Sequence, residues 1–203
     1  MSRIAIVSSL IAGLAAVPAA AAPQSYTIDP AHTYPSFEAD HMGMSVWRGK
    51  FNRSNGEVVL DLEQSTGTVQ VEVDVASVDF GHDGMSEHAR EAEMLDAAQF
   101  PTATYRGTFA DFVGGKPRRV DGELTLRGVT RPLALEIVKF NCKPHPMKKV
   151  EFCGADARAS FERDEFGIEA GKQWGFDMTV DLRIQVEAVA TDADAEPKDA
   201  TKK

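Results

Sequence analysis

Hydrophobic and polar residues alternate along most of the chain. Valine occupies every second position over Val69–Val75, and the same alternation runs over Val120–Leu126 and Val180–Val186. A further alternating run covers Cys153–Phe161. A period of two residues is typical of a β-strand with one buried and one solvated face. The pattern therefore predicts a protein built almost entirely of strands.

Turn-forming residues separate these runs. Glycine-containing pairs stand at Asn55–Gly56 and Gly114–Gly115, a single glycine stands at Gly128, and Asp164–Gly167 indicates a further turn. Such residues adopt the backbone conformations that tight turns require. Their positions divide the chain into a succession of strands.

One segment departs from the alternation. Over Met85–Ala98 the apolar residues Met85, Ala89, Ala92 and Leu95 recur at helical spacing, opposite charged residues. The pattern predicts a helix that ends before Phe100–Pro101, because proline disfavours helical backbone at the residue before it.

The number of strands bears on how the sheet is arranged. Exposed strand edges invite aggregation, and closing the sheet removes them. An antiparallel barrel of about eight strands is therefore the first expectation, and a β-sandwich is the second. A barrel of this size can enclose one small ligand, and long strands favour an elongated cavity. The short helix would then act as a lid or plug at one end.

The two ends of the chain differ from this domain. Residues 1–21 combine a short basic start, the apolar run Ile4–Val17 and small residues, which is the layout of a secretory signal cleaved after Ala21. The apolar run is shorter than the roughly 20 residues that span a bilayer. Residues 22–190 are predicted to form one domain. Residues 191–203 lack large apolar side chains, so a disordered tail is expected there.

Charge and cysteine content narrow the choice of partners. The chain of 203 residues has a net charge of −9, which argues against nucleic acid because that binding depends on Lys and Arg. Cys142 and Cys153 are the two cysteines, and export would place them in an oxidising compartment. A disulfide between them is favoured over a reactive thiol or a metal ligand.

No residue pattern points to catalysis. The sequence lacks the Gly-x-Ser-x-Gly, P-loop and Gly-x-Gly-x-x-Gly runs. His82 and His88 do not have the spacing that places two metal ligands on one helical face. We therefore expect no enzyme, no cofactor and no dedicated metal site.

The first long strand directs one polar side chain inward. Counting by twos from Thr33 puts Phe37, Ala39 and His41 on the apolar face. His41 would then either meet the polar end of a ligand or bond to backbone near the barrel rim as a structural residue. His32 is a second candidate for the ligand contact.

The pattern alone does not decide between a hollow and a filled interior. Aromatic residues and methionines suit a flexible lipid chain and a dry core equally well. Small inward residues leave space between the large ones and slightly favour a cavity; these are Ala39, Gly107, Gly122, Ala155, Ala157 and Ala159.

Residues 26–51 have the sequence YTIDPAHTYPSFEADHMGMSVWRGKF, and residues 122–132 have the sequence GELTLRGVTRP. These two segments resemble signatures of the YceI-like family of secreted bacterial lipid-binding barrels. The resemblance extends over about Tyr26–Ala188 and includes Pro101–Thr102, Arg163 and Phe166–Gly167. The phrases FNCKPHPM and CGADARASFERDEFG resemble a proteobacterial branch of this family with a paired-cysteine hairpin.

The resemblance implies a lipocalin-like, extended barrel in the periplasm that holds a polyisoprenoid or another long amphiphile. It also implies that Met94–Leu95, where the family usually has two phenylalanines, alter the pocket shape. The expected contacts to the polar head are His32 and His41. The expected pocket wall comprises Phe37, Ala39, His41, Met42, Phe51, Met94, Leu95, Phe100, Phe109, Leu124, Leu126, Phe161, Trp174, Phe176 and Met178.

Three functional hypotheses follow. The leading one is a periplasmic carrier of a long-chain isoprenoid or related lipid that contacts the membrane transiently. The resemblance to the family, which includes dimers, also allows a homodimer. The second is a filled-barrel inhibitor or interaction module that binds a secreted protein through the hairpin end Lys143–Lys149. The third is a metal- or redox-linked periplasmic enzyme.

Overall fold

The computed structural model describes residues 22–191, so the predicted signal segment (1–21) and all but the first residue of the predicted tail (191–203) lie outside the described residues. Strands dominate this range, and no helix within it is long and apolar enough to cross a membrane. The elements are β1 Gln24–Ile28, β2 Tyr34–His41, β3 Ser45–Phe51, β4 Ser54–Asp61, β5 Thr66–Asp74, η1 Val75–Ser77, β6 Val78–Asp79, α1 Asp83–Arg90, β7 Thr102–Ala110, β8 Arg119–Leu126, β9 Val129–Pro132, β10 Leu135–Pro144, β11 Glu151–Glu162, η2 Arg163–Phe166, η3 Lys172–Trp174 and β12 Thr179–Ala190.

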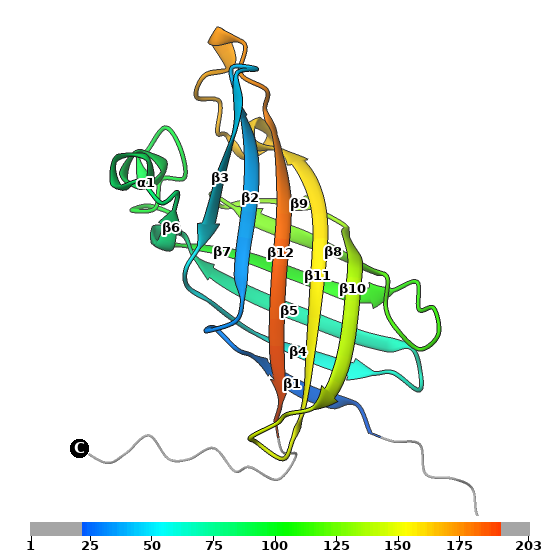
Figure 1. Cartoon of the computed structure of the whole chain (residues 1–203). Coiled ribbons are helices and arrows are strands. Elements are labelled where there is room, and N and C mark those ends of the chain that lie inside the picture. Colours follow the sequence, from blue (N-terminus) through cyan, green and yellow to red (C-terminus); the bar gives the residue numbers. More distant parts are fainter. Residues whose placement is uncertain (1–21, 192–203) are drawn as a thin grey trace, which may run out of the picture.

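Eight strands form a closed antiparallel barrel (Figure 1). Their order is β1-β4-β5-β7-β8-β10-β11-β12, and the ring closes because β12 pairs again with β1. Tyr26 on β1 thus lies between Val58 on β4 and Ala190 on β12. The prediction of an eight-stranded barrel is confirmed.

The long strand β12 is shared between two neighbours. Its last residues pair with β1, whereas Val180–Gln185 pair with β2, so β2, β3 and β6 extend the wall beyond the ring. Pro35 lies opposite Ile184 on β12. The pairing of β2 with β3 begins at Ser36 of β2, so Pro35 has no partner on β3. Proline is tolerated here because β2 is an edge strand at this residue.

The helix is shorter than the sequence predicts. α1 ends at Arg90, whereas the periodicity extends to Ala98. Glu91 has extended backbone, and the chain then folds back so that the N–H of Leu95 donates to a carbonyl in the last turn of α1 at 3.1 Å. The guanidinium of Arg127 donates to two carbonyls of this folded-back segment. This contact from a distant turn satisfies the carbonyls without a continued helix.

The predicted turn at Asn55–Gly56 is also wrong, because both residues lie inside β4. A Cβ on Gly56 would come within 2.2 Å of the Gln70 carbonyl oxygen and 3.0 Å of the Ile28 side chain. The glycine therefore serves close packing between strands and not a change of chain direction.

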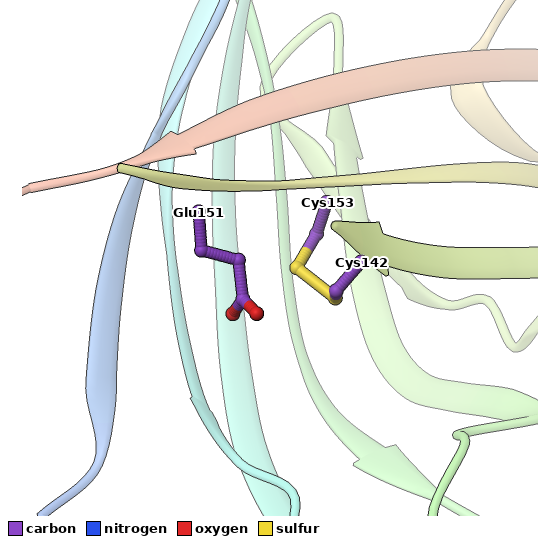
Figure 2. A group of neighbouring side chains, drawn as sticks. All are labelled: Cys142, Glu151 and Cys153. Atoms are coloured by element: carbon purple, nitrogen blue, oxygen red, sulfur yellow. A yellow bond between two sulfur atoms is a disulfide. The ribbon is translucent and has the colours of Figure 1, made fainter. Parts of the chain in front are cut away.

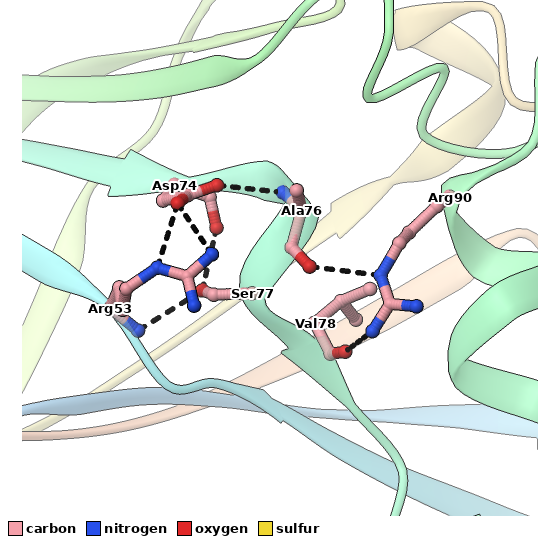
Figure 3. Close-up of polar contacts among 6 residues, drawn as sticks. All are labelled: Arg53, Asp74, Ala76, Ser77, Val78 and Arg90. Atoms are coloured by element: carbon pink, nitrogen blue, oxygen red, sulfur yellow. Dashed lines mark hydrogen bonds and ion pairs between the residues drawn. The ribbon is translucent and has the colours of Figure 1, made fainter. Parts of the chain in front are cut away.

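A polar network fixes η1 and α1 against the start of β4 (Figure 3). The guanidinium of Arg53 pairs with the Asp74 carboxylate at 2.7 Å. Arg90 on α1 donates from Nε and Nη2 to backbone carbonyls of η1 and β6, at 2.8 and 3.0 Å. This anchoring directs Met85 and Ala89 of α1 toward the barrel interior, where both line the cavity.

Candidate functional site: the barrel cavity

The barrel encloses a cavity of about 670 Å³. Inward side chains from every strand of the ring contribute to its wall, and α1 with its following segment covers part of it. Val180 and Ala188 of β12 both line it, so its wall follows this strand for about 26 Å at about 3.3 Å per residue. The sequence-predicted wall residues found there are Phe37, Ala39, His41, Phe51, Met94, Leu95, Phe109, Leu124, Leu126, Phe161, Trp174 and Phe176.

The interior is hollow and not filled. Val69, Val71, Leu182 and Ile184 face inward, yet each remains partly exposed. The buried residues form three separate clusters, whereas a packed domain usually has one contiguous core. Inward side chains therefore border open space.

The small residues of the wall play two different roles. Ala39, Ala155 and Ala157 line the cavity as expected. Gly122 does not leave open space, because a Cβ there would lie 2.5 Å from the hydroxyl oxygen of Tyr105. The ring of Tyr105 fills this room, and its hydroxyl donates to the Leu133 carbonyl at 2.9 Å. Burial raises the pKa of Tyr105 well above its usual range, so the phenol stays neutral.

The cavity opens at one end of the barrel. Among its wall residues, Glu93, Gln173 and Trp174 are the exposed ones. The opening therefore lies between the segment that follows α1 and the segment around η3. Asp40 and His41, at the end of β2, also belong to this part of the wall.

His41 points inward, as the alternation predicts. Its ring stacks on Trp47 with a centroid separation of 3.9 Å and meets the edge of Phe176 at 5.3 Å. Within residues 22–191 the imidazole makes no hydrogen bond to protein, so it is not bonded to backbone as a structural histidine would be. The ring is therefore held in place by two aromatic neighbours.

Trp47 was missed by the sequence analysis. It occupies the same face of β3 as Phe51, two residues before Gly49, so alternation along this strand is the signal that could have found it.

Arg163 is a second residue that the sequence analysis did not place in the site. It is 8% exposed and lies on the cavity wall. Its Nη1 and Nη2 donate to the carbonyls of Ile168 and Ala170, at 3.1 and 2.7 Å. Burial lowers the pKa of its guanidinium. The side chain thereby holds the loop that leads to Trp174, and periodicity cannot reveal such a backbone contact.

Three predicted wall residues lie elsewhere. Met42 is in the β2–β3 turn with a left-handed backbone (φ 58°), and its side chain is 51% exposed. Phe100 packs over Gly128, with the guanidinium of Arg127 6.0 Å from its ring centre. Met178 precedes β12 and is buried without reaching the cavity. All three stand where the chain turns, so alternation no longer fixes their direction.

His32 is also absent from the cavity wall. It lies in the β1–β2 connection, its side chain is 62% exposed, and its Nδ1 is 2.8 Å from Oδ2 of Asp29. That hydrogen bond raises the pKa of His32 and lowers the pKa of Asp29. His32 therefore lies outside the cavity wall, and its contact with a ligand stays a prediction.

The predicted disulfide is confirmed. Cys142 and Cys153 lie opposite each other on β10 and β11, and their sulfurs are bonded (Figure 2). Nearby Glu151 accepts a hydrogen bond from the Tyr26 hydroxyl at 2.6 Å. Burial, reinforced by this carboxylate, raises the pKa of Tyr26. These contacts tie the β10–β11 hairpin to β1 at the end opposite the opening.

Among residues 22–191, two groups of side chains have the composition of metal ligands. Cys142, Glu151 and Cys153 form one, but both of its sulfurs are used in the disulfide. His88, Glu91 and Glu93 form the other beside the opening, where His88 Nδ1 is 2.9 Å from Glu91 Oε2. This second group is partly to fully exposed, and its contacts are those of an ordinary surface ion pair.

The sequence also matches a known family model, the YceI-like domain, over residues 26–188. The chain belongs to the YceI-like family. Two curated relatives are UPF0312 proteins. The one from Vibrio cholerae is 32% identical over 184 residues, covering 88% of this chain and 94% of the relative. The one from Shewanella sp. (strain W3-18-1) is 36% identical over 167 residues, covering 81% and 87%.

Solved structures share this YceI-like fold. Burkholderia cenocepacia BcnA has a TM-score of 0.62 at 18% identity, covering 79% of this chain and 98% of that one. Campylobacter jejuni YCEI protein has a TM-score of 0.63 at 19% identity, covering 75% and 90%. A polyisoprenoid binding domain from Saccharophagus degradans, implicated in plant cell wall breakdown, has a TM-score of 0.57 at 16% identity, covering 83% and 99%.

Proposed function

We propose that this protein is a periplasmic carrier that holds a long-chain polyisoprenoid or related amphiphilic lipid inside the barrel. The observation that carries the proposal is the elongated, apolar cavity, which opens between the segment after α1 and the segment around η3. Its volume of about 670 Å³ lies within the range of roughly 300–1,000 Å³ typical of ligand sites.

The chemistry of the wall favours a hydrocarbon chain. Apart from its histidines, the wall has three charged side chains, those of Asp40, Glu93 and Arg163. A polar ligand would lose its hydration along the remaining length without gaining hydrogen bonds. A long apolar chain instead gains about 25 cal/mol for each Å² of its surface removed from water.

The polar end of the ligand belongs near the opening. His41, His88, Glu93 and Gln173 supply hydrogen-bonding groups there, and the His41 ring is already oriented by Trp47. The name of the Saccharophagus degradans structural relative supports isoprenoids as the ligand class. The predicted secretory signal and the disulfide support a periplasmic location.

The two alternative hypotheses receive less support. The hypothesis of a filled-barrel interaction module is not supported, because the interior is hollow. At the proposed docking hairpin, the Lys143 ammonium lies 5.3 Å from the Phe152 ring centre, a contact within the hairpin itself. The role proposed here is binding. Among the described wall residues, no nucleophile lies beside a base, so the wall gives the enzyme hypothesis no support.

Native mass spectrometry of the mature protein, purified from the periplasm without detergent, tests the proposal. We expect an adduct that releases a long-chain lipid into organic solvent. Ala155→Phe, which places a ring in the cavity, should reduce the adduct strongly. Arg158→Phe, on the exposed face of the same strand, is the matched control and should leave it unchanged. A bare protein mass that persists after incubation with isoprenoid lipids would refute the carrier function.

A further inference from the structure

Exposed hydrophobic side chains gather at one end of the molecule. Among the described residues, seven large hydrophobic side chains are exposed, and four of them lie in two adjacent segments. Met42 (51% exposed), Met44 (83%) and Val46 (47%) belong to the β2–β3 turn and the start of β3, and Trp174 (69%) belongs to η3. We call these four residues the apolar rim.

The two segments of the apolar rim lie together. Figure 1 shows the β2–β3 turn and the segment before β12 at the same end, where both project beyond the barrel. The edge contact between the rings of His41 and Phe176, at 5.3 Å, joins them. Isolated exposed hydrophobic residues are ordinary, but a group of them on projecting segments is typical of an interaction surface.

The apolar rim is continuous with the cavity. Trp174 belongs to both, because it is exposed to solvent and also lines the wall at the opening. His41 and Trp47, which flank the rim residues in sequence, line the same wall. A hydrocarbon chain that leaves the opening therefore meets the rim first.

Two pairs of oppositely charged side chains lie beside the apolar rim. Arg48 pairs with Glu38 at 2.7 Å, and Lys172 pairs with Asp164 at 2.6 Å. The carboxylate of Asp40 accepts a hydrogen bond from the N–H of Gly43 at 2.8 Å. The opposite end of the barrel differs, because its β10–β11 turn exposes several lysines. The rim thus fits an apolar partner, whereas the lysine-rich turn would attract anions.

We propose that the apolar rim docks on a lipid bilayer, so that the cavity opening faces the membrane from which the ligand comes. The inference rests on the proposed carrier function, which gives the membrane a role. Tryptophan is enriched at the bilayer interface, and the two exposed methionines are flexible apolar side chains that suit disordered lipid. Direct transfer from bilayer to cavity keeps the chain out of water. A second copy of the protein on the rim would instead cover the opening.

Binding to phosphatidylcholine vesicles at high salt tests the docking. The neutral lipid and the salt suppress any attraction through the lysine-rich turn. The test variant is Met42→Asn/Met44→Asn, in which asparagine suits the left-handed backbone of Met42 and neither residue lines the cavity. Met147→Asn is the matched control, since Met147 is 84% exposed in the β10–β11 turn.

We expect the double variant to lower the vesicle partition coefficient at least about tenfold, and the control to leave it unchanged. Farnesol binding without vesicles should be the same in all three proteins. Equal vesicle binding by the double variant, or no vesicle binding by the unmodified protein, would overturn the docking. So would a double variant that only converts a dimer to a monomer. Absence of farnesol and longer isoprenoid binding in the unmodified protein would instead refute the carrier function, whatever the vesicles show.

Discussion

Replacement of Phe109 by alanine tests whether the barrel interior is hollow. Phe109 lies on β7, lines the cavity and remains partly exposed. Phe166 is the matched residue, because it is 1% exposed, does not line the cavity and meets the edge of Phe161 at 5.2 Å. The two substitutions remove the same side chain from a wall and from a packed cluster.

The expected costs differ for a physical reason. Phe166→Ala leaves a new closed void, and such core substitutions lower the free energy of unfolding by about 3–5 kcal/mol. Phe109→Ala only enlarges a space that is already empty, so no new cavity contributes. Its ring also keeps part of its surface exposed, so it loses less than the full burial energy. We expect its cost to be about 1–2 kcal/mol.

Urea unfolding of lipid-free, refolded protein measures both values. The free energy of unfolding of each variant is compared with that of the unmodified protein. The comparison requires that the free energy depend equally steeply on urea concentration in all three, since a change in that slope would indicate a change in the compactness of the denatured or native state. A cost for Phe109→Ala as large as that for Phe166→Ala would refute the reasoning, because it would mean that the interior closes around Phe109 in solution.

Three further predictions concern the ends of the barrel. Replacing Cys142 and Cys153 together by alanine should lower the free energy of unfolding by about 3 kcal/mol, the chain-entropy value for a loop of this length, and an unchanged urea midpoint would contradict this. Asp29→Asn should lower the pKa of His32, measured by NMR titration. The raised pKa of His32 stabilises the folded state fully at pH values below the ordinary pKa of 6.5. The lowered pKa of Asp29 stabilises the folded state fully at pH values above the ordinary pKa of 3.8. The pair therefore contributes most to the free energy of unfolding between pH 3.8 and 6.5. Arg163→Met should speed amide hydrogen exchange in the loop between η2 and β12 while β4 and β5 stay protected; unchanged exchange would argue against its positioning role.

The barrel was predictable because its main signal is local. Alternation is a property of each strand alone, and it correctly turned Thr33, Pro35, Phe37, Ala39 and His41 toward the interior. The errors arose where a distant segment decides the local conformation. The contact from Arg127 replaces the expected last turns of the helix, and the backbone of a neighbouring strand explains the glycine in β4.

The cavity itself was less predictable. The same alternation describes a filled and a hollow barrel, because it gives the direction of a side chain and not what lies opposite. Gly122 illustrates this. The sequence predicts that this glycine leaves space in the cavity, but Tyr105 from the adjacent strand occupies that space. Met42 shows a second limit of the pattern: at the first residue of a turn, alternation no longer gives the direction of the side chain.

The two ends of the barrel favour one direction for an amphiphile. At the end away from the opening, Tyr26, Ile28, Leu60 and Cys153 are buried together, and the Tyr26 hydroxyl is already bonded to Glu151. A polar head placed there would lose its hydration among buried apolar side chains. An uncompensated polar group costs on the order of several kcal/mol in such an environment. At the opening, the head keeps contact with water and with the imidazole of a histidine that already lines the wall. The chain would therefore enter first and the head last, so that release through the same opening begins with the head.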